Sequence, residues 1–189
     1  MRVVGGTWRG RRLSAPRGEA VRPTTDRVKE AVFSILGDLV PDATVLDLCC
    51  GAGGLGIEAL SRGAAHAVFV DSDREALAAV RGNLQACGAA AGRHTLVRAE
   101  VVAWLGRWQP PAGPWLVLAD PPYAQPLAAA LVPLLEALAA HPGFRAAVLE
   151  HPARGPALPD GACARDLRRY GETAITILRP AGAADGEGS

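Results

Sequence analysis

The chain has 189 residues, of which 49% are hydrophobic and 21% are charged, and its formal net charge is +1. This length and composition fit one ordinary domain with a substantial core. No apolar run approaches the length of a membrane span, and the first residues, M-R-V-V-G-G-T-W-R-G, lack the apolar core of a secretion signal. We therefore expect a cytoplasmic protein with no membrane partner.

Positive charge is concentrated near the N-terminus. Residues 1–29 contain eight basic and two acidic side chains, so the rest of the chain is net negative. A basic arm on a slightly acidic domain favours a polyanionic partner, and nucleic acid is the one we expect. A solvated surface without a partner is the alternative. The four cysteines lack zinc-site spacing, so we interpret them as reduced hydrophobic residues and expect no bound metal; they are Cys49, Cys50, Cys87 and Cys163.

The segment 1–22 is expected to be a basic β-hairpin arm. Residues 2–13 suggest two short strands, with Gly5-Gly6 as a tight turn. Trp8 could stack on a base or could equally be the core anchor of the hairpin. The candidate RNA-binding residues are Trp8, Arg9, Arg11 and Arg12. A helix should follow, with Thr24 or Thr25 as its N-cap, and end near Gly37.

The stretch from Thr44 to Gly56, T-V-L-D-L-C-C-G-A-G-G-L-G, predicts a strand, a glycine turn and a helix. Glycine allows the main chain to approach a ligand closely because it has no Cβ. The stretch satisfies G-x-G-x-x-G, so a dinucleotide site is one interpretation, and simple packing of a helix on a strand is another. However, Asp47 would repel a pyrophosphate and attract an ammonium group such as that of S-adenosylmethionine (SAM).

A second strand, 67–71, ends at Asp71, about twenty residues beyond the first glycine. A carboxylate at this place can accept hydrogen bonds from both ribose hydroxyls of a nucleoside. This argument serves NAD and SAM equally. It therefore indicates a nucleoside ligand without choosing one.

Strand and helix patterns alternate through the rest of the expected main domain, 23–179. A helix over 73–87 precedes a strand over 95–98 and a brief helix over 101–105. A continuous apolar strand over 115–119, typical of a sheet buried on both faces, precedes a helix over 127–140. A fifth strand over 144–149 and a hairpin formed by 165–169 and 173–178 complete the domain. The pattern predicts an α/β fold with a parallel sheet, and we expect 180–189 to be disordered.

The fourth strand leads into Asp120-Pro-Pro-Tyr123. Two prolines fix the backbone and remove two N–H donors, so acceptor groups face outward beside an aromatic ring. Such a site suits the exocyclic amine of a nucleic-acid base. Hydrogen bonds to Asp120 and to the carbonyl of Pro121 would hold the nitrogen lone pair toward an electrophile.

These motifs resemble those of SAM-dependent methyltransferases that act on exocyclic amines. Four further segments resemble the bacterial 16S ribosomal RNA guanine-N2 methyltransferase family, called RsmD: R-V-V-G-G-T-W-R-G-R-R-L, R-P-T-T-D-R-V-K-E-A-V-F, L-G-I-E-A-L-S-R-G-A and Y-G-E-T-A. The resemblance implies the Rossmann-like class I fold. In that fold a mainly parallel seven-stranded sheet ends in an antiparallel hairpin, and this family would add an N-terminal β-hairpin extension.

The resemblance also implies an activity and roles for individual residues. The reaction would be methyl transfer from SAM to N2 of one guanine in 16S rRNA, within the small ribosomal subunit or an assembly intermediate. Asp47, Gly51 and Gly53 would line the methionine end of SAM and Asp71 would bind its ribose. Asp120 and Pro121 would bind the target amine and Tyr123 the base. Glu100 and Val101 follow the third strand, near the place expected for the adenine.

Other readings remain open. An N6-adenine or protein-glutamine methyltransferase could use the same motif, since all three reactions modify a planar amine. An RNA-binding assembly factor that keeps SAM as a structural ligand is possible, although such a factor would not need acceptors at the amine position. A nicotinamide dehydrogenase is the most distant alternative.

Overall fold

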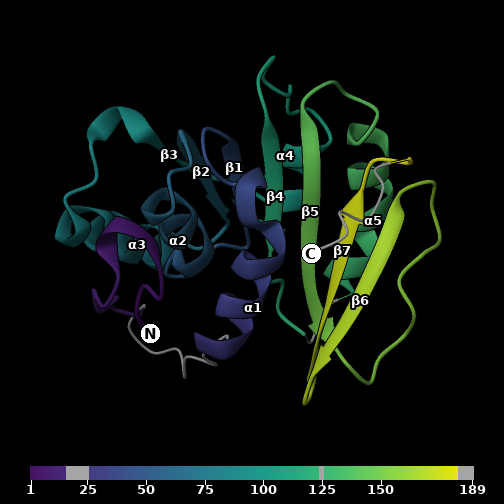
Figure 1. Cartoon of the computed structure of the whole chain (residues 1–189), viewed down its shortest axis with the longest axis horizontal. Helices are drawn as coiled ribbons and strands as arrows, with labels where there is room; N and C mark the ends of the chain where they lie inside the picture. Colours follow the sequence, from purple (N-terminus) through teal and green to yellow (C-terminus); the bar gives the residue numbers. More distant parts are fainter. Residues whose placement is uncertain (16–25, 124–125, 183–189) are drawn as a thin grey trace.

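A seven-stranded sheet in the order β3-β2-β1-β4-β5-β7-β6 forms the centre of the computed structural model, which describes residues 1–15, 26–123 and 126–182 (Figure 1). Strands β1 to β5 pair in parallel, and β7 pairs antiparallel with both β5 and β6. The mainly parallel sheet with a C-terminal antiparallel hairpin confirms the expected fold. The strands are β1 (Thr44–Leu48), β2 (His66–Asp71), β3 (His94–Arg98), β4 (Trp115–Ala119), β5 (Phe144–Pro152), β6 (Ala164–Tyr170) and β7 (Thr173–Arg179).

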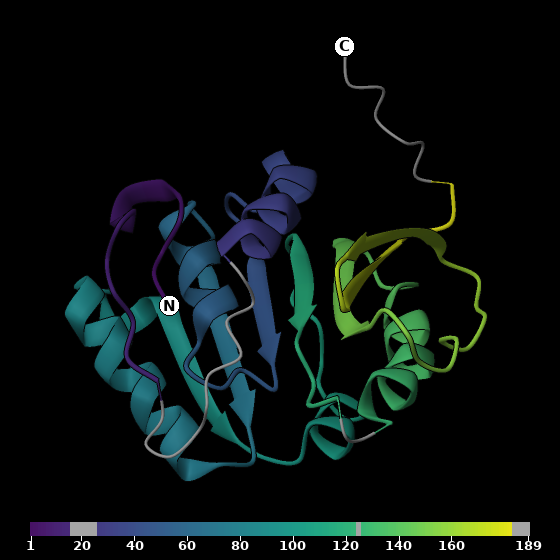
Figure 2. The same ribbon diagram turned by 90° about the horizontal axis from the view of Figure 1, so that it is seen from below.

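Helices cover both faces of this sheet (Figures 1 and 2). Helices α1, α2 and α3 pack on one face, and α4 and α5 pack on the other. They are α1 (Asp26–Leu36), α2 (Gly54–Ser61), α3 (Arg74–Cys87), α4 (Val101–Leu105) and α5 (Leu127–Leu138), with short 3-10 helices η1 (Gly6–Trp8), η2 (Gly37–Leu39) and η3 (Ala91–Arg93). None of the helices in the described ranges is long and apolar enough to cross a membrane.

The apolar sequence of β4 reflects its position in the sheet. All five of its residues are buried, because they face helices in both directions. Leu116 and Leu118 contact the α1 side, whereas Val117 contacts the α4 and α5 side. The side chains of Val45 and Leu46 in β1 alternate in the same way, so the two central strands supply core residues to both layers.

Most predicted boundaries lie within one or two residues of the observed ones. The exception is β5, which continues to Pro152 because its last residues pair with β7, from Glu150 opposite Ile175 to Pro152 opposite Thr173. Thr24 and Thr25, the proposed caps of α1, lie outside the described residues, as does 183–189 of the expected tail.

The N-terminal arm differs from the expected hairpin. A single antiparallel bridge joins Arg2 and Arg12, and the 3-10 helix Gly6–Trp8 replaces the tight turn at Gly5-Gly6. The N–H groups of Val4 and Gly5 donate instead to the carboxylate of Glu58 on α2, at 2.8 and 2.7 Å. The segments on either side still pair antiparallel, since the N–H of Val3 donates to the carbonyl of Arg11 at 2.9 Å and the N–H of Leu13 to the carbonyl of Met1 at 3.0 Å. The hairpin is thus present in a short form, and only the expected tight turn was wrong.

The sheet order determines where a ligand can bind. From β1 the chain proceeds to β2 and β3 on one side, and it returns to β4 on the other side of β1. The connections after β1 and β4 thus leave the sheet in opposite directions and open a crevice at the carboxyl ends of these strands. Asp47 in β1 and Asp120 directly after β4 both lie at this edge.

Candidate functional site

Asp71 and Gly51 connect the first two strands at the carboxyl edge. One carboxylate oxygen of Asp71 accepts the N–H of Gly51 at 2.9 Å, and the other accepts the N–H of Asp73 at 2.9 Å. Asp71 therefore fixes the glycine turn that follows β1, in addition to its proposed contact with ribose. Its side chain is partly exposed, so further hydrogen bonds at its oxygens are sterically possible.

Asp47 lies deeper than the sequence suggested. It is 2% exposed, and its Oδ2 accepts the N–H of Gly56 in the first turn of α2 at 2.8 Å. A Cβ on Gly56 would come within 2.4 Å of the Phe69 ring and 3.0 Å of this oxygen. Gly56 is therefore required for close packing of α2 on β1 and β2, and Asp47 anchors the N-terminus of that helix.

The turn between β1 and α2 has an unusual backbone. Gly51 and Gly53 adopt positive φ angles of 50° and 78°, and Cys49, which is not a glycine, adopts 55°. A left-handed conformation at a residue with a Cβ costs energy and persists only where the surrounding structure enforces it. A Cβ on Gly51 would meet no atom within 4 Å, so this position faces open space, as a ligand-contacting glycine should.

Carboxylates from several strand ends converge around Cys49. Burial raises the pKa of its thiol to about 12, and the charges of Asp71, Asp47, Asp120 and Glu100 add to this shift. Burial also raises the pKa of Asp47 well above its ordinary range, although the N–H of Gly56 opposes this, and Asp120 and Asp71 raise it further. Such an electronegative crevice suits a cationic ligand and disfavours a pyrophosphate. The chemistry of these residues therefore fits SAM, which carries an ammonium and a sulfonium.

Glu100 and Val101 have clear structural functions. The two oxygens of Glu100 accept the N–H groups of Val102 and Ala103 at 3.0 and 2.7 Å, so this residue is the N-cap of α4. Val101 is 5% exposed, and its side chain belongs to the core beneath α4 and α5. A cofactor contact by Glu100 would compete with the cap, whereas the backbone of Val101 could contribute without disturbing the core.

The Asp120-Pro-Pro-Tyr123 segment continues directly from β4. Asp120 is partly exposed and Pro121 is buried. The hydroxyl of Tyr123 donates to Glu150 Oε1 at 3.1 Å and lies 2.9 Å from Thr173 Oγ1. These two partners come from the end of β5 and the start of β7, so the ring of Tyr123 is held from outside its own loop.

The environment keeps Tyr123 protonated. Burial raises the pKa of its hydroxyl to about 12; the hydrogen bond with Thr173 opposes the shift, while Glu150 and Asp120 raise the pKa. Tyr123 can therefore present its ring and donate a hydrogen bond near neutral pH, but it is not a general base. The sequence patterns described above single out neither Glu150 nor Thr173. Thr173 follows the Tyr170-Gly171 turn, and this turn was the available signal for it.

The four proposed RNA-binding residues occupy the arm, but not equally. Trp8 is half-buried and packs against the α2 and α3 core, so it serves as an anchor of the arm. The three arginines among these residues are all exposed, but Arg11 also donates a hydrogen bond to the carbonyl of Ala86 at 3.1 Å. Arg9 and Arg12 thus remain the better candidates for phosphate contacts.

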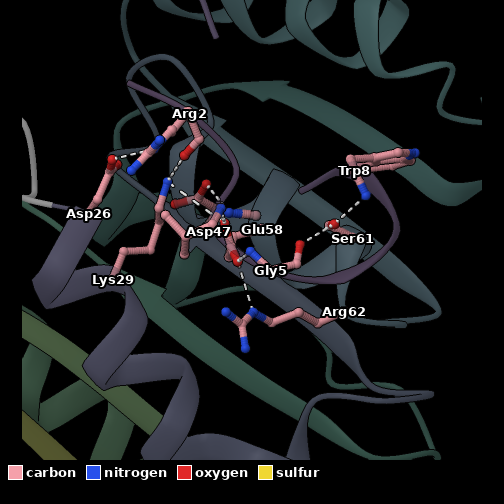
Figure 3. Close-up of polar contacts among 11 residues, drawn as sticks. Arg2, Gly5, Trp8, Asp26, Lys29, Asp47, Glu58, Ser61 and Arg62 are labelled. Carbon is pink, nitrogen blue, oxygen red and sulfur yellow. Dashed lines mark hydrogen bonds and ion pairs between the residues drawn. The ribbon is translucent and has the colours of Figure 1, made fainter. Parts of the chain in front are cut away.

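A buried polar network, which we did not expect from the sequence, attaches the arm to the domain (Figure 3). Glu58 is fully buried; besides the two arm N–H groups, its carboxylate pairs with Arg62 at 2.8 Å and with Lys29 at 3.8 Å. Lys29 is 1% exposed and donates to the carbonyl of Arg2. A glutamate within the apolar sequence G-L-G-I-E-A-L was the one signal of this network.

Comparison with known proteins gives consistent matches. A model for the family described as Conserved hypothetical protein 95 matches residues 1–179. The protein named Ribosomal RNA small subunit methyltransferase D from Escherichia coli (strain K12) is 38% identical over 136 residues, which are 72% of this chain and 67% of that protein. YlbH of Bacillus subtilis (strain 168) is 51% identical over 85 residues, but this alignment spans only 46% of that protein.

Solved structures agree over nearly the whole chain. The yhhF protein of Escherichia coli has a TM-score of 0.76 and 31% identity, and the match covers 96% of this chain and 98% of that one. A hypothetical protein of Thermus thermophilus has a TM-score of 0.75 and 28% identity, with 95% and 99% coverage. The fold is thus shared along nearly the full length of these structures.

Proposed function

The chain belongs to the family described as Conserved hypothetical protein 95, and from that membership we propose that it methylates N2 of a guanine in 16S ribosomal RNA with SAM as the methyl donor. Relatives named Ribosomal RNA small subunit methyltransferase D, from Escherichia coli and Haemophilus influenzae, support the reaction class and the substrate. These relatives and the sequence motifs described above thus point to the same family, RsmD.

One structural observation carries the proposal. The Asp120-Pro-Pro-Tyr123 segment leaves β4 beside β1, so its carboxylate lies in the same electrostatic environment as Asp47 and Asp71. A site for a cationic nucleoside and a site for a planar amine therefore adjoin at one edge of the sheet. This arrangement is what transfer of a group between two such molecules requires.

We assign the cofactor to the β1 and β2 side of the crevice. In this assignment Asp71 binds the ribose, Gly51 and Gly53 let the backbone approach the ligand, and Asp47 anchors the N-terminus of α2 beneath it. SAM, when bound, supplies an electrophilic methyl group on a sulfonium. We also assign Glu100 and Val101 to the region near the adenine of SAM. Val101 would contact the adenine through its backbone, because its side chain is buried.

We assign the guanine to the β4 side. The N2 amine is a poor nucleophile because its lone pair is delocalised into the ring. Hydrogen bonds from this amine to Asp120 and to the Pro121 carbonyl favour a pyramidal nitrogen and orient its lone pair. The ring of Tyr123, fixed by Glu150 and Thr173, supports the base. After transfer, the surplus proton leaves to Asp120 or to water.

Methyl transfer from labelled SAM to small ribosomal subunits of a strain that lacks this gene tests the proposal. We expect label in 16S rRNA, and digestion followed by mass spectrometry should identify N2-methylguanosine. Free 16S rRNA, DNA and total protein are the parallel acceptors that separate the competing enzyme classes. Label in N6-methyladenosine or in protein, and none in guanosine, would overturn the assignment.

A further inference from the structure

A groove of about 310 Å³ lies beside the C-terminal hairpin, on the α5 side of the sheet. Its walls are the segment 153–158, which follows β5, and side chains of β5, β6 and β7. Nothing in the proposed reaction uses this groove. The lining residues that matter here are His151, Pro152, Leu158, Leu167, Arg169 and Thr176.

The groove adjoins the proposed guanine site. Glu150 and Thr173, which hold the Tyr123 hydroxyl, immediately precede His151 and Ala174, which line the groove. Successive strand residues point to opposite faces, so the guanine site and the groove lie on opposite sides of the same strand ends. An extended polymer bound at the first site would reach the second by passing over the carboxyl end of β5.

The groove combines an apolar wall with a positive charge. Leu167 is 45% exposed, which is unusual for a large apolar side chain in this protein, and Arg169 two residues later is also exposed. The second arginine of the lining, Arg165, is engaged by Glu136 at 2.8 Å. The described residues that line the groove include no acidic side chain.

The imidazole of His151 is fixed in place between these features. Nε2 lies 2.8 Å from Thr176 Oγ1, and Nδ1 lies 3.2 Å from the carbonyl of Pro152. Burial lowers the pKa of His151, the Pro152 carbonyl opposes this, and the charge of Arg169 lowers the pKa further. Arg169 and His151 flank Ala174 in one cross-strand row, so an anion bound at Arg169 would lie on the same side of the sheet as the imidazole.

We propose that this groove binds a nucleotide adjacent to the target guanine, with a phosphate on Arg169 and the base against Leu167 and Pro152. The inference rests on the proposed function and names a second subsite for its substrate. The volume is at the lower end of the range for small-molecule sites, about 300–1,000 Å³, which suits one nucleotide and not a folded element. Arginine beside an apolar or aromatic surface is the combination that single-stranded RNA requires.

The test uses the full-length protein and small ribosomal subunits from a strain lacking this gene. Arg169→Ala and Leu167→Ala should each raise KM for subunits by about 10-fold, leave kcat within about 2-fold and leave SAM affinity unchanged. Arg169→Ala should also lower the salt slope of RNA binding by about 0.7, the value for one single-strand phosphate contact. Arg169→Lys should restore most of the affinity, because it keeps the charge.

Arg145→Ala is the matched control, because this arginine is exposed on the amino end of β5, at the opposite edge of the sheet. The subsite is overturned if wild-type protein methylates the subunits while the Arg169 and Leu167 variants match Arg145→Ala in KM and salt slope. Wild-type protein that neither binds nor methylates the subunits would overturn the proposed function and the subsite together.

Discussion

The buried carboxylate of Glu58 on α2 accepts the backbone N–H of Gly5 at 2.7 Å, and so joins two parts of the chain that are 53 residues apart. The same helix begins at the glycine turn of the proposed cofactor site, where Gly56 donates to Asp47. The arm is thus attached to α2, the helix whose N-terminus lies at the proposed cofactor site (Figure 3).

Glu58→Gln should strongly destabilise the fold. The amide loses the charge that compensates Lys29 and Arg62, and removal of one partner of a buried pair costs about 3–5 kcal/mol. Urea unfolding measures this cost, and amide hydrogen exchange at Val4 and Gly5 should become faster. Glu30→Gln, an exposed position on α1, is the control. Equal stability of the two variants would contradict the role assigned to Glu58.

Asp71→Ala should weaken SAM binding by about 1–3 kcal/mol, because ribose hydroxyls and the N–H of Gly51 lose their acceptor. Asp71→Asn retains one acceptor oxygen and should lose less. Isothermal calorimetry on folded protein checks both variants, with Glu75→Gln in the first turn of α3 as the control. Unchanged affinity in Asp71→Ala would remove this residue from the cofactor site.

The double substitution Arg9→Ala and Arg12→Ala should lower RNA affinity without affecting SAM binding. Each lost phosphate contact should reduce the salt slope by about one unit. Arg11 is left intact because its guanidinium contacts the Ala86 carbonyl and contributes to the position of the arm. Filter binding at several salt concentrations gives the slope. A slope equal to that of the wild type would mean that the arm does not contact phosphate.

Two substitutions of Asp120 can separate its effect on the orientation of the amine from the effect of its charge. Asp120→Asn keeps an acceptor oxygen, so it should retain substantial activity if orientation of the amine dominates, whereas Asp120→Ala should lose about 100-fold or more. If the carboxylate must take the proton, both variants should lose activity together. Single-turnover rates at saturating RNA measure the effect, and SAM affinity should stay nearly constant. An active Asp120→Ala enzyme would exclude this residue from the chemistry.

The Glu136–Arg165 pair predicts a pH-dependent contribution to stability. Burial raises the pKa of Glu136, but hydrogen bonds from the Cys163 N–H and from Arg165 outweigh it, so the pKa falls below its ordinary value of 4.5. A lowered pKa means that the contribution is complete above the ordinary value and is lost as the pH falls through the folded-state pKa. The unfolding free energies of wild type and Glu136→Gln should therefore differ most near neutral pH and converge in acid. A constant difference across this range would refute the assignment.

Local sequence patterns were sufficient for the architecture. The alternation of short apolar runs with amphipathic helices fixes the order of elements, because helix and strand periodicities depend on near neighbours. The glycine turn after β1, the acids at the ends of β1, β2 and β4, and Asp120-Pro-Pro-Tyr123 could be found in the same way, since each is a short motif at a strand end.

The tertiary structure alone decided how these pieces hold one another. Glu58 holds the arm through the N–H groups of Val4 and Gly5. Glu150 and Thr173 fix Tyr123 from 27 and 50 residues away, and the groove at Arg169 forms between three strands. Each depends on which faces of distant segments meet after folding. A sequence read in short windows contains each partner but not their pairing, because the energy of a buried hydrogen bond or ion pair is determined by the packed environment around both groups.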